Sequence, residues 1–354
     1  MTLLDGVQNL LPYGATTTLQ TTMSNLLDAY KRNELDPTTG LGIFALSATL
    51  TDRAEPSESL KATTVWQIGL DPATTLLSTA QRDAFCRGRT VVQETDIKGR
   101  RGAYLVHAQL DLAGHTEHSW SLVADVNQDH SQVATLRNLL AGDRTMLAQQ
   151  VETDITQGSQ DLVRLVAAAD GVQQTADPLT TAHHFANVLF NIMRGGIFVD
   201  NDRVQRADLV DFVQTRNRAL LAAQAAFFAG LPDTLSITEL YARGAATDSP
   251  DLIRLCYEYL PLTFSRRHGD PSRPWNRFSI NLKQPDGSRR LDYQGNWRDI
   301  FQNWEPLAWS YPMFIEGMIA KFLNATTADG YNPYRVTRDG IEWEAPEPHN
   351  PWST

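Results

Sequence analysis

Residues 118–140 read HSWSLVADVNQDHSQVATLRNLL, and the spacing of the apolar side chains changes within this stretch. In its first half, Trp120 and Leu122 flank a polar serine, which is the alternation of a strand buried on one face. From Val133 onward, apolar residues recur every three or four positions, as on one face of a helix. The stretch therefore predicts that a sheet gives way to helices near residues 128–135.

The chain before this change is rich in strand patterns. β-branched and aromatic residues dominate its period-two segments, and Gly, Asp and Asn separate them. One helix is expected over residues 18–34, and residues 5–14 read as a turn that leads into it. Since most of the strands have no helix between them, we predict an antiparallel β-sandwich-like domain over residues 1–130. The other predicted strands cover residues 42–50, 63–70, 90–95 and 103–112.

The chain after the change is expected to be helical. We predict linker helices over residues 131–175 and an all-α domain over residues 176–354. Gly195 and Gly196 would close one of the helices, because glycine is common just past a helix C-terminus. The fold class is therefore α+β, with a sandwich followed by a helical domain. The expected helices cover residues 133–155, 162–166, 185–192, 210–228, 251–260 and 309–323.

The composition is that of an ordinary globular protein, and it excludes several function classes. The 354 residues are 42% hydrophobic and 20% charged, and 31 Lys and Arg against 41 Asp and Glu give a net charge of −10. Proteins that bind nucleic acid usually carry a basic surface, so neither nucleic acid nor an anionic membrane is an expected partner. We recognise no apolar run that could span a bilayer and no signal peptide, so a cytoplasmic location is expected.

Metal and cofactor sites are not expected either. Cys86 and Cys256 are too far apart in the sequence for a zinc motif or a disulfide framework. His183 and His184 have no carboxylate at ligand spacing. Glycine-rich nucleotide motifs and nucleophile elbows are also lacking. We therefore predict a protein with no bound metal and no cofactor.

The region after residue 270 carries the chemistry. Aromatic side chains are interspersed there with guanidinium, carboxylate and amide groups. This mixture suits a sugar, because the C–H face of a pyranose stacks on an aromatic ring while its hydroxyls need bidentate donors and acceptors. Nucleobases also stack on aromatic rings, but the acidic balance disfavours a phosphate backbone. Six of the eight tryptophans lie in this region: Trp275, Trp297, Trp304, Trp309, Trp343 and Trp352.

Residues 293–305, YQGNWRDIFQNWE, form the densest polar and aromatic segment. Gly295 permits a sharp turn, and a helix is expected to begin just after it. Asp299 and Glu305 are the candidate catalytic carboxylates. The alternative is a surface Arg–Asp pair beside two core tryptophans. The candidate substrate-binding residues of this segment are Trp297, Arg298, Asp299, Gln302, Asn303 and Trp304.

Two further loops carry candidate binding residues. Residues 266–277, RRHGDPSRPWNR, are constrained by two prolines and a glycine, and residues 329–335, DGYNPYR, read as turns. The alternative in each case is a structural role, with Arg–Asp bridges inside the first loop and plain surface charges near the second. The candidates from these loops are Arg267, His268, Asp270, Trp275, Asn332, Tyr334 and Arg335.

The order of these parts resembles the six-hairpin glycosidases and glycoside phosphorylases, in which a β-sandwich and a linker helix precede an (α/α)6 barrel. The amylo-alpha-1,6-glucosidase-like and cellobiose-phosphorylase-like groups are closest in style. Residues 295–299, GNWRD, are similar to the W-x-R-D type of segment that begins an early barrel helix in related enzymes. The resemblance implies that Arg298 and Asp299 clamp sugar hydroxyls beside Trp297. Residues 330–333, GYNP, are similar to the loops that line the next hairpin.

The resemblance also implies a part that this chain lacks. The general acid and base of such enzymes usually come from later barrel helices, which would lie beyond Thr354. We therefore expect a fragment, whose partners are an oligosaccharide or polysaccharide and the remainder of its own barrel. Two functions are open: an inverting glycoside hydrolase or phosphorylase that uses two carboxyl groups, and a non-catalytic carbohydrate-binding or assembly module without that pair.

Overall fold

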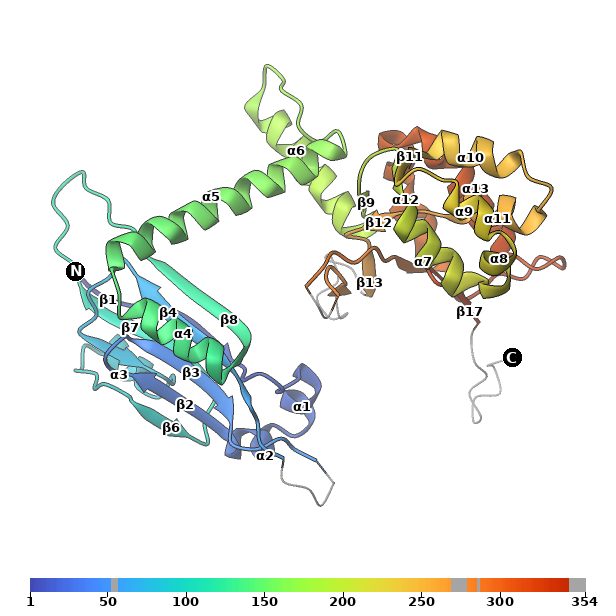
Figure 1. Cartoon of the computed structure of the whole chain (residues 1–354). Coiled ribbons are helices and arrows are strands. Elements are labelled where there is room, and N and C mark those ends of the chain that lie inside the picture. Colours follow the sequence, from blue (N-terminus) through green and yellow to red (C-terminus); the bar gives the residue numbers. More distant parts are fainter. Residues whose placement is uncertain (52–56, 269–278, 285–286, 344–354) are drawn as a thin grey trace. The chain divides into compact units, whose positions relative to one another are not determined.

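The computed structural model describes residues 1–51, 57–268, 279–284 and 287–343. The chain divides into two compact units, Met1–Gln157 and Gly158–Thr354, which we name the sandwich unit and the helical unit (Figure 1). The division falls within the long helix α5 (Arg144–Ala168). Within the described ranges, no helix is both long and apolar enough to cross a membrane.

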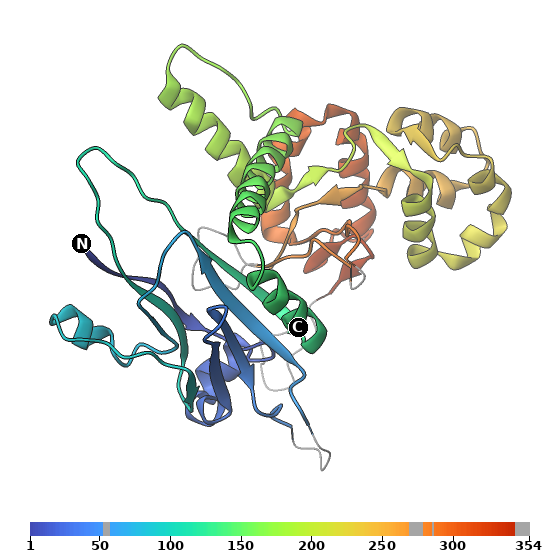
Figure 2. The same ribbon diagram turned by 60° about the vertical axis from the view of Figure 1, so that its left-hand side comes forward.

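The sandwich unit contains two antiparallel sheets that lie face to face (Figure 2). The larger sheet has the strand order β6-β2-β3-β4-β8, and the smaller sheet has the order β1-β7-β5. This arrangement confirms the predicted antiparallel sandwich. The strands are β1 (Thr2–Leu10), β2 (Lys31–Asp36), β3 (Leu41–Leu46), β4 (Lys61–Ile68), β5 (Thr74–Leu76), β6 (Asp96–Lys98), β7 (Gly102–Gln109) and β8 (Ser121–Asp129), and a short helix α3 (Arg82–Cys86) precedes β6.

The main core of the sandwich unit lies between the two sheets. Phe44 and Val65 from the larger sheet pack in one cluster with Tyr104 and Val106 from the smaller sheet. All four side chains are buried. Because burying a side chain of this size stabilises the fold by about 1.5–3 kcal/mol, this cluster supplies much of the free energy that holds the sheets together.

Helix α4 (His130–Leu140) follows β8 directly and covers the outer face of the larger sheet (Figure 1). Asp129 caps this helix, because its carboxylate accepts the N–H of Gln132 at 2.9 Å. The Gln132 side chain in turn accepts the N–H of Asp129 at 2.9 Å, which completes a capping box. The predicted change from sheet to helix near residues 128–135 is therefore confirmed.

The predicted helix over residues 18–34 is wrong. Two short helices, α1 (Thr17–Thr22) and α2 (Ser24–Ala29), are followed at once by strand β2. The strand did not show in the hydrophobic pattern, because polar Lys31 and Asn33 occupy its buried face. Lysine and asparagine are rarely fully buried, so the alternation of β2 was masked.

Two other expectations for this unit are also wrong. The turn predicted over residues 5–14 is replaced by β1, which has Gly6 at its centre. A Cβ at Gly6 would lie 1.9 Å from the carbonyl oxygen of Tyr104, so the close approach of β1 to β7 requires glycine. Residues 90–95 form no strand, and the Glu94 carboxylate instead accepts a backbone N–H just after β5 at 2.7 Å.

Helix α5 runs without a break across the gap expected between the helices predicted at residues 133–155 and 162–166. The break falls earlier, at residues 141–143. Asp143 restarts the helix there, since its carboxylate accepts the N–H of Thr145 at 2.8 Å. The capping side chain, and not the spacing of apolar residues, sets this boundary.

The helical unit is built from helices joined by short antiparallel strand pairs. The expected all-α domain is thus not purely helical, because β9 pairs with β12, β10 with β11, β13 with β14, and β15-β16-β17 form a small sheet. Pairings of two or three residues are too short to show a period of two. The strands are β9 (Ile197–Phe198), β10 (Arg203–Gln205), β11 (Thr234–Ser236), β12 (Leu262–Thr263), β13 (Arg266–His268), β14 (Ser279–Ile280), β15 (Gln294–Asn296), β16 (Arg335–Thr337) and β17 (Ile341–Glu342). The helices are α6 (Pro178–Gly195), α7 (Arg206–Arg216), α8 (Arg218–Ala223), α9 (Ala225–Ala229), α10 (Ile237–Ala245), α11 (Pro250–Glu258), α12 (Trp297–Ser310) and α13 (Ile315–Ala325), with a short 3-10 helix (Pro312–Phe314) before α13.

One continuous apolar core holds the helical unit together. Phe198 of β9 stacks on Phe314 with 3.7 Å between the ring centroids, and Tyr311 packs edge-on against Phe198 at 5.1 Å. Gly196 closes α6, as predicted, with a φ of 87°. Its N–H donates to the carbonyl of Ile192 at 2.8 Å, so the glycine both ends the helix and turns the chain into β9.

Candidate functional site

Three segments that lie far apart in the sequence meet at the start of α12. β15 pairs with β16, which places Asn296 opposite Arg335, and β13 contacts β15. Helix α12 begins at Trp297 directly after β15, as predicted. A Cβ at Gly295 would lie 2.9 Å from the side chain of Ile300, so this tight entry to the helix suits glycine. The parts of the three candidate segments that the structure describes are therefore neighbours.

Asp299 lies in the first turn of α12 between two arginines. Its Oδ2 is 3.6 Å from Nη2 of Arg266, and its Oδ1 is 3.6 Å from Nε of Arg298. The side chain of Arg266 is 10% exposed and that of Asp299 is 27% exposed, whereas that of Arg298 is 82% exposed. Both distances exceed hydrogen-bond length, so the carboxylate keeps acceptor capacity for another donor. Arg298 extends over the surface, and Arg266 is the enclosed partner.

Arg335 lies at the centre of a second group of polar side chains, close to helix α12. Its Nε donates to Oδ1 of Asn296 at 3.4 Å, and its Nη1 donates to Oε1 of Gln294 at 3.3 Å. Nη1 also lies 3.1 Å from Oε2 of Glu342. The half-exposed ring of Tyr334 is 5.6 Å from the guanidinium carbon of Arg335. This face therefore presents guanidinium, amide and carboxylate groups beside an aromatic ring.

The two tryptophans of α12's first half have different environments. Trp297 is partly buried, and its ring packs edge-on against Phe301 at 5.1 Å and Phe322 at 5.8 Å. Trp304 is 3% exposed and packs against Tyr293 and Phe322 in the core. Trp304 is thus a core residue of this unit, whereas Trp297 is partly buried and packs on the side of α12 that faces α13.

The remaining candidates on α12 and after α13 are spread around these centres. Gln302 is exposed, and Asn303 is buried against α6, where its carbonyl oxygen would lie 2.2 Å from a Cβ at Gly195. The Oδ1 of exposed Asn332 accepts a hydrogen bond from the Thr326 hydroxyl at 3.1 Å. Asn303 therefore faces the helix interface, and Asn332 is tied to the end of α13.

The candidates from residues 266–277 are only partly described. Arg267 and His268 belong to β13, and His268 is paired with Ser279 of β14. Asp270 and Trp275 lie outside the described residues. For Arg267 and His268, therefore, only the backbone position in β13 is described, whereas the neighbouring Arg266 of the same strand contributes its side chain to the site.

Asp299 and Glu305 do not face each other across one cleft. Side chains six positions apart on an α-helix, at ~100° per residue, point ~120° apart around the axis. Asp299 faces Arg266, and exposed Glu305 lines a groove between α12 and α13. The assignment of these two carboxylates as a catalytic pair stays a prediction.

The groove between α12 and α13 is apolar and encloses about 420 Å³. Ile315, Ile319 and Leu323 follow one another at every fourth position along α13, and all three are exposed. Contiguous apolar surface of this kind usually marks an interaction site in a soluble protein. The residues that line the groove are Phe301, Trp304, Glu305, Ala308, Ile315, Met318, Ile319, Phe322 and Leu323.

Buried charges tie the candidate site to the rest of the helical unit. Arg338, just after β16, donates from Nη2 to Oδ1 of Asp208 at 2.7 Å and from Nη1 to Oδ2 at 3.2 Å. The Tyr259 hydroxyl donates to the same carboxylate at 2.5 Å. Burial, together with the charge of Asp208, raises the pKa of Tyr259 well above its usual value, so the hydroxyl stays protonated and keeps donating.

Glu258 and Lys321 extend this buried network, and sequence reasoning missed both. Glu258 accepts from Arg216 at 3.1 Å, from Arg254 at 3.2 Å and from Asn324 at 2.9 Å. Lys321 is buried, and its Nζ has no hydrogen-bond partner in the described part of the chain. Burial lowers the pKa of its ammonium to about 7. A lysine on the otherwise apolar inner face of α13 was the available signal.

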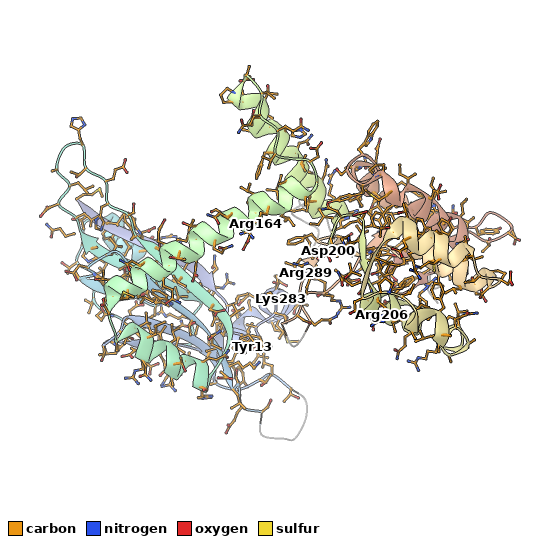
Figure 3. The ribbon with its side chains drawn as sticks, turned by 45° about the horizontal axis from the view of Figure 1, so that its top comes forward. Tyr13, Arg164, Asp200, Arg206, Lys283 and Arg289 are labelled. Carbon is orange, nitrogen blue, oxygen red and sulfur yellow. The ribbon has the colours of Figure 1, made fainter. Side chains whose placement is uncertain are left out.

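A separate hollow of the helical unit encloses about 600 Å³. Arg164 of α5 and Arg289, which precedes β15, both line it (Figure 3). Arg164 pairs there with Asp161 at 2.8 Å, and none of the residues predicted from the sequence lines this hollow. Among the residues that the structure describes, no group of three His, Cys, Asp or Glu side chains is placed to hold a metal ion.

A family model described as glycoside hydrolase family 149 insertion domain 1 matches residues 198–261. The similarity supports a chain related to glycoside hydrolases. No curated protein matches the chain. The matched residues, which we name the matched segment, run from the end of β9 to the residue before β12.

The matched segment supports the candidate site without containing it. α11 of this segment packs on α13, and both contribute to the same core as α12. Asp208 of α7 lies within the segment and holds Arg338, which follows β16. The part of the chain that is similar to a glycoside hydrolase domain is therefore bonded to the strand that carries Arg335.

Proposed function

We propose that this chain binds a saccharide at the start of α12, as part of a carbohydrate-active protein related to glycoside hydrolases and glycoside phosphorylases. The observation that carries the proposal is the position of Asp299, which is paired with enclosed Arg266 at 3.6 Å and keeps free acceptor capacity. A carboxylate held in this way accepts hydrogen bonds from adjacent sugar hydroxyls.

The groups around Asp299 support a polyhydroxylated ligand. Arg298 is 82% exposed and keeps most of its donors in solvent. Arg335, Gln294 and Asn296 bring a guanidinium and two amides to the same sheet edge. Tyr334 provides exposed aromatic surface there, of the kind that packs on a pyranose. In the proposed binding mode, Asp299 accepts hydrogen bonds from sugar hydroxyls, and Arg298 donates hydrogen bonds to the sugar from the solvent side.

The matched segment adds independent support for the carbohydrate class. Its similarity is to an insertion domain of a glycoside hydrolase family, and it shares the core of the helical unit. The Asp208–Arg338 pair connects it to the sheet that borders the site. Within the proposal, the matched segment is the scaffold that fixes β16 beside the sugar.

Binding without turnover is a second candidate function for this chain, and the position of Glu305 favours it. Inverting glycosidases place two carboxyl groups about 6.5–9.5 Å apart across the scissile bond. Asp299 and Glu305 point to different sides of α12, and Glu305 borders the apolar groove. In this version, the chain is a non-catalytic carbohydrate-binding or assembly module that lacks the acid–base pair.

We propose that the chain binds a protein partner at the apolar groove, in addition to a saccharide at the start of α12. Its exposed wall residues Ile315, Ile319 and Leu323 have the spacing of a helix face that packs on another helix. We assign further helices of the same barrel as the occupant. This partner would bury the exposed apolar side chains that line the groove.

A glycan-binding screen with product analysis tests the proposed function. The chain is expected to bind one class of neutral oligosaccharide and to release little or no product, either in buffer or with added inorganic phosphate. Robust turnover would show that the acid and base lie within this chain and would remove the second candidate. Absence of binding to every neutral saccharide in the screen would overturn the proposal.

A further inference from the structure

The sandwich unit holds a pocket of about 440 Å³. Leu35 and Gln67 of the larger sheet line it, together with Thr75 and Tyr104 of the smaller sheet. Arg144 at the start of α5 also lines it. A space of this size between two sheets is within the range of small-molecule sites.

The walls of this pocket are fixed by hydrogen bonds within the protein. The Tyr104 hydroxyl donates to the carbonyl of Gly40 at 2.7 Å, which ties the smaller sheet to the turn between β2 and β3. The side-chain amide of Gln67 donates to the carbonyl of Leu70 and accepts its N–H, both at 3.1 Å. A ligand would therefore meet a preformed shape and lose little free energy in ordering it.

Two charged groups line the pocket with most of their hydrogen-bonding capacity unused. Nη2 of Arg144 donates one hydrogen bond to the carbonyl of Gln67 at 3.1 Å, and the other donors of Arg144 have no partner among the described residues. Asp71 has no hydrogen bond or ion pair within the described part of the chain, although it lines the same pocket. The two charges are opposite in sign and are not paired with each other.

Neutral groups complete the lining. Thr38 and Thr75 line the pocket, and their hydroxyls make no hydrogen bond to any described residue. Pro37 and Pro72 add rigid apolar surface. The pocket thus offers one carboxylate, one guanidinium, hydroxyls and apolar patches, with no net charge. A ligand with several adjacent hydroxyls and an apolar ring face can use all of these groups at once.

We infer that this pocket binds a small neutral saccharide, in which Asp71 accepts from one pair of hydroxyls and Arg144 donates to another oxygen. The site belongs to the sandwich unit, whereas the start of α12 belongs to the helical unit. The inference therefore does not rest on the proposed function. A chain with both sites would hold a saccharide at two separate positions.

Hydrogen–deuterium exchange of the full chain, measured by mass spectrometry, tests the inference. The probes are glucose, cellobiose and, as a zwitterion of similar small size, free alanine. Glucose or cellobiose is expected to slow exchange in peptides that cover residues 37–40 and 70–75. In Asp71→Ala and Arg144→Ala, the apparent affinity should fall at least ~10-fold, as expected when a charge-assisted hydrogen bond is lost. The matched controls Asp154→Ala and Arg89→Ala, which replace exposed residues of the same unit, should keep the protection.

The outcomes separate this site from the one at α12. Protection at residues 294–299 alone would overturn the inference and leave the proposed function standing. Protection at residues 37–40 and 70–75 alone would support the inference and count against the proposed function. Protection by alanine but by neither sugar would reject the saccharide class. Protection that persists in both pocket variants would reject Asp71 and Arg144 as its ligands.

Discussion

Arg338 donates two parallel hydrogen bonds to Asp208, from Nη2 to Oδ1 at 2.7 Å and from Nη1 to Oδ2 at 3.2 Å. The Arg338 side chain is 7% exposed, so this pair is largely removed from water. It joins the strand that carries Arg335 to the matched segment. This interaction therefore links the matched segment to the candidate site through two residues that are far apart in the sequence.

Replacing Arg338 should lower the free energy of unfolding of the helical unit. Arg338→Ala leaves the carboxylate of Asp208 without its main partner, and breaking a buried ion pair typically costs about 3–5 kcal/mol. Urea denaturation should show this loss in the transition of the helical unit. Arg298→Ala is the matched control, because its side chain is 82% exposed and should change stability by no more than about 0.5 kcal/mol. Equal effects of the two variants would contradict the role given to Arg338.

Lys321 makes the stability of the helical unit depend on pH. Burial lowers the folded-state pKa of Lys321 to about 7, and the facing Arg216 and Arg338 lower it further while Glu258 and Asp339 oppose them. The unfolded value is about 10.4. Between these values the unfolded state binds more protons, so stability should rise as the pH increases from about 7 to about 10.

The variant Lys321→Met isolates this effect. It removes a buried amine without a hydrogen-bond partner in the described residues, and should stabilise the helical unit by about 1–3 kcal/mol at neutral pH. The gain should shrink towards pH 10, where the wild-type amine is already neutral. Urea midpoints at several pH values measure the difference. A gain that is constant across this range would show that Lys321 does not titrate in the folded protein.

Gly196 should not tolerate a side chain. Its φ of 87° disfavours other residues, and a Cβ would lie 2.5 Å from the carbonyl oxygen of Thr263. Gly330 has the same φ of 87° but open space around it, so Gly330→Ala reports the backbone strain alone, at about 1 kcal/mol. Gly196→Ala should cost clearly more in thermal unfolding. Similar melting temperatures for the two variants would mean that the turn into β9 relaxes without cost.

The apolar groove should cause this chain to bind hydrophobic molecules and to self-associate. Ile319 and Leu323 are 52% and 69% exposed, so Ile319→Lys and Leu323→Lys should leave the melting temperature nearly unchanged. They should reduce the fluorescence of a bound hydrophobic dye and any self-association seen by sedimentation velocity. Met318→Lys, at a buried position of the same helix, should instead destabilise the unit. Dye fluorescence that is the same in both surface variants as in the wild type would argue against the groove as a docking site.

The sequence predicted the large features of the fold, because they repeat over many residues. Five or more residues of alternating pattern identified β3, β4, β7 and β8, and the change of period identified the boundary at β8 and α4. β2 was missed because Lys31 and Asn33 occupy its buried face. The strand pairs of the helical unit were missed because two or three residues carry no periodicity.

The candidate site was predicted in part for similar reasons. The segment at α12 could be recognised from its local density of polar and aromatic residues, and the start of the helix after Gly295 followed from turn chemistry. The partner of Asp299 could not be foreseen, because Arg266 reaches it only through the packing of β13 on β15. The core position of Trp304 was equally hidden, since an indole ring has the same local signature in a core and in a sugar site.

The most direct test of the proposed function is calorimetric titration of the chain and of Asp299→Ala with the neutral oligosaccharide that binds best in the screen. We expect the variant to bind at least ~10-fold more weakly, because a buried hydroxyl loses its acceptor. We also expect a nearly unchanged melting temperature, since both ion-pair distances of Asp299 are 3.6 Å. The control Asp248→Ala, at an exposed position of the same unit, should bind like the wild type. Unchanged affinity together with a lowered melting temperature for Asp299→Ala would show a purely structural ion pair and contradict a role of Asp299 in saccharide binding.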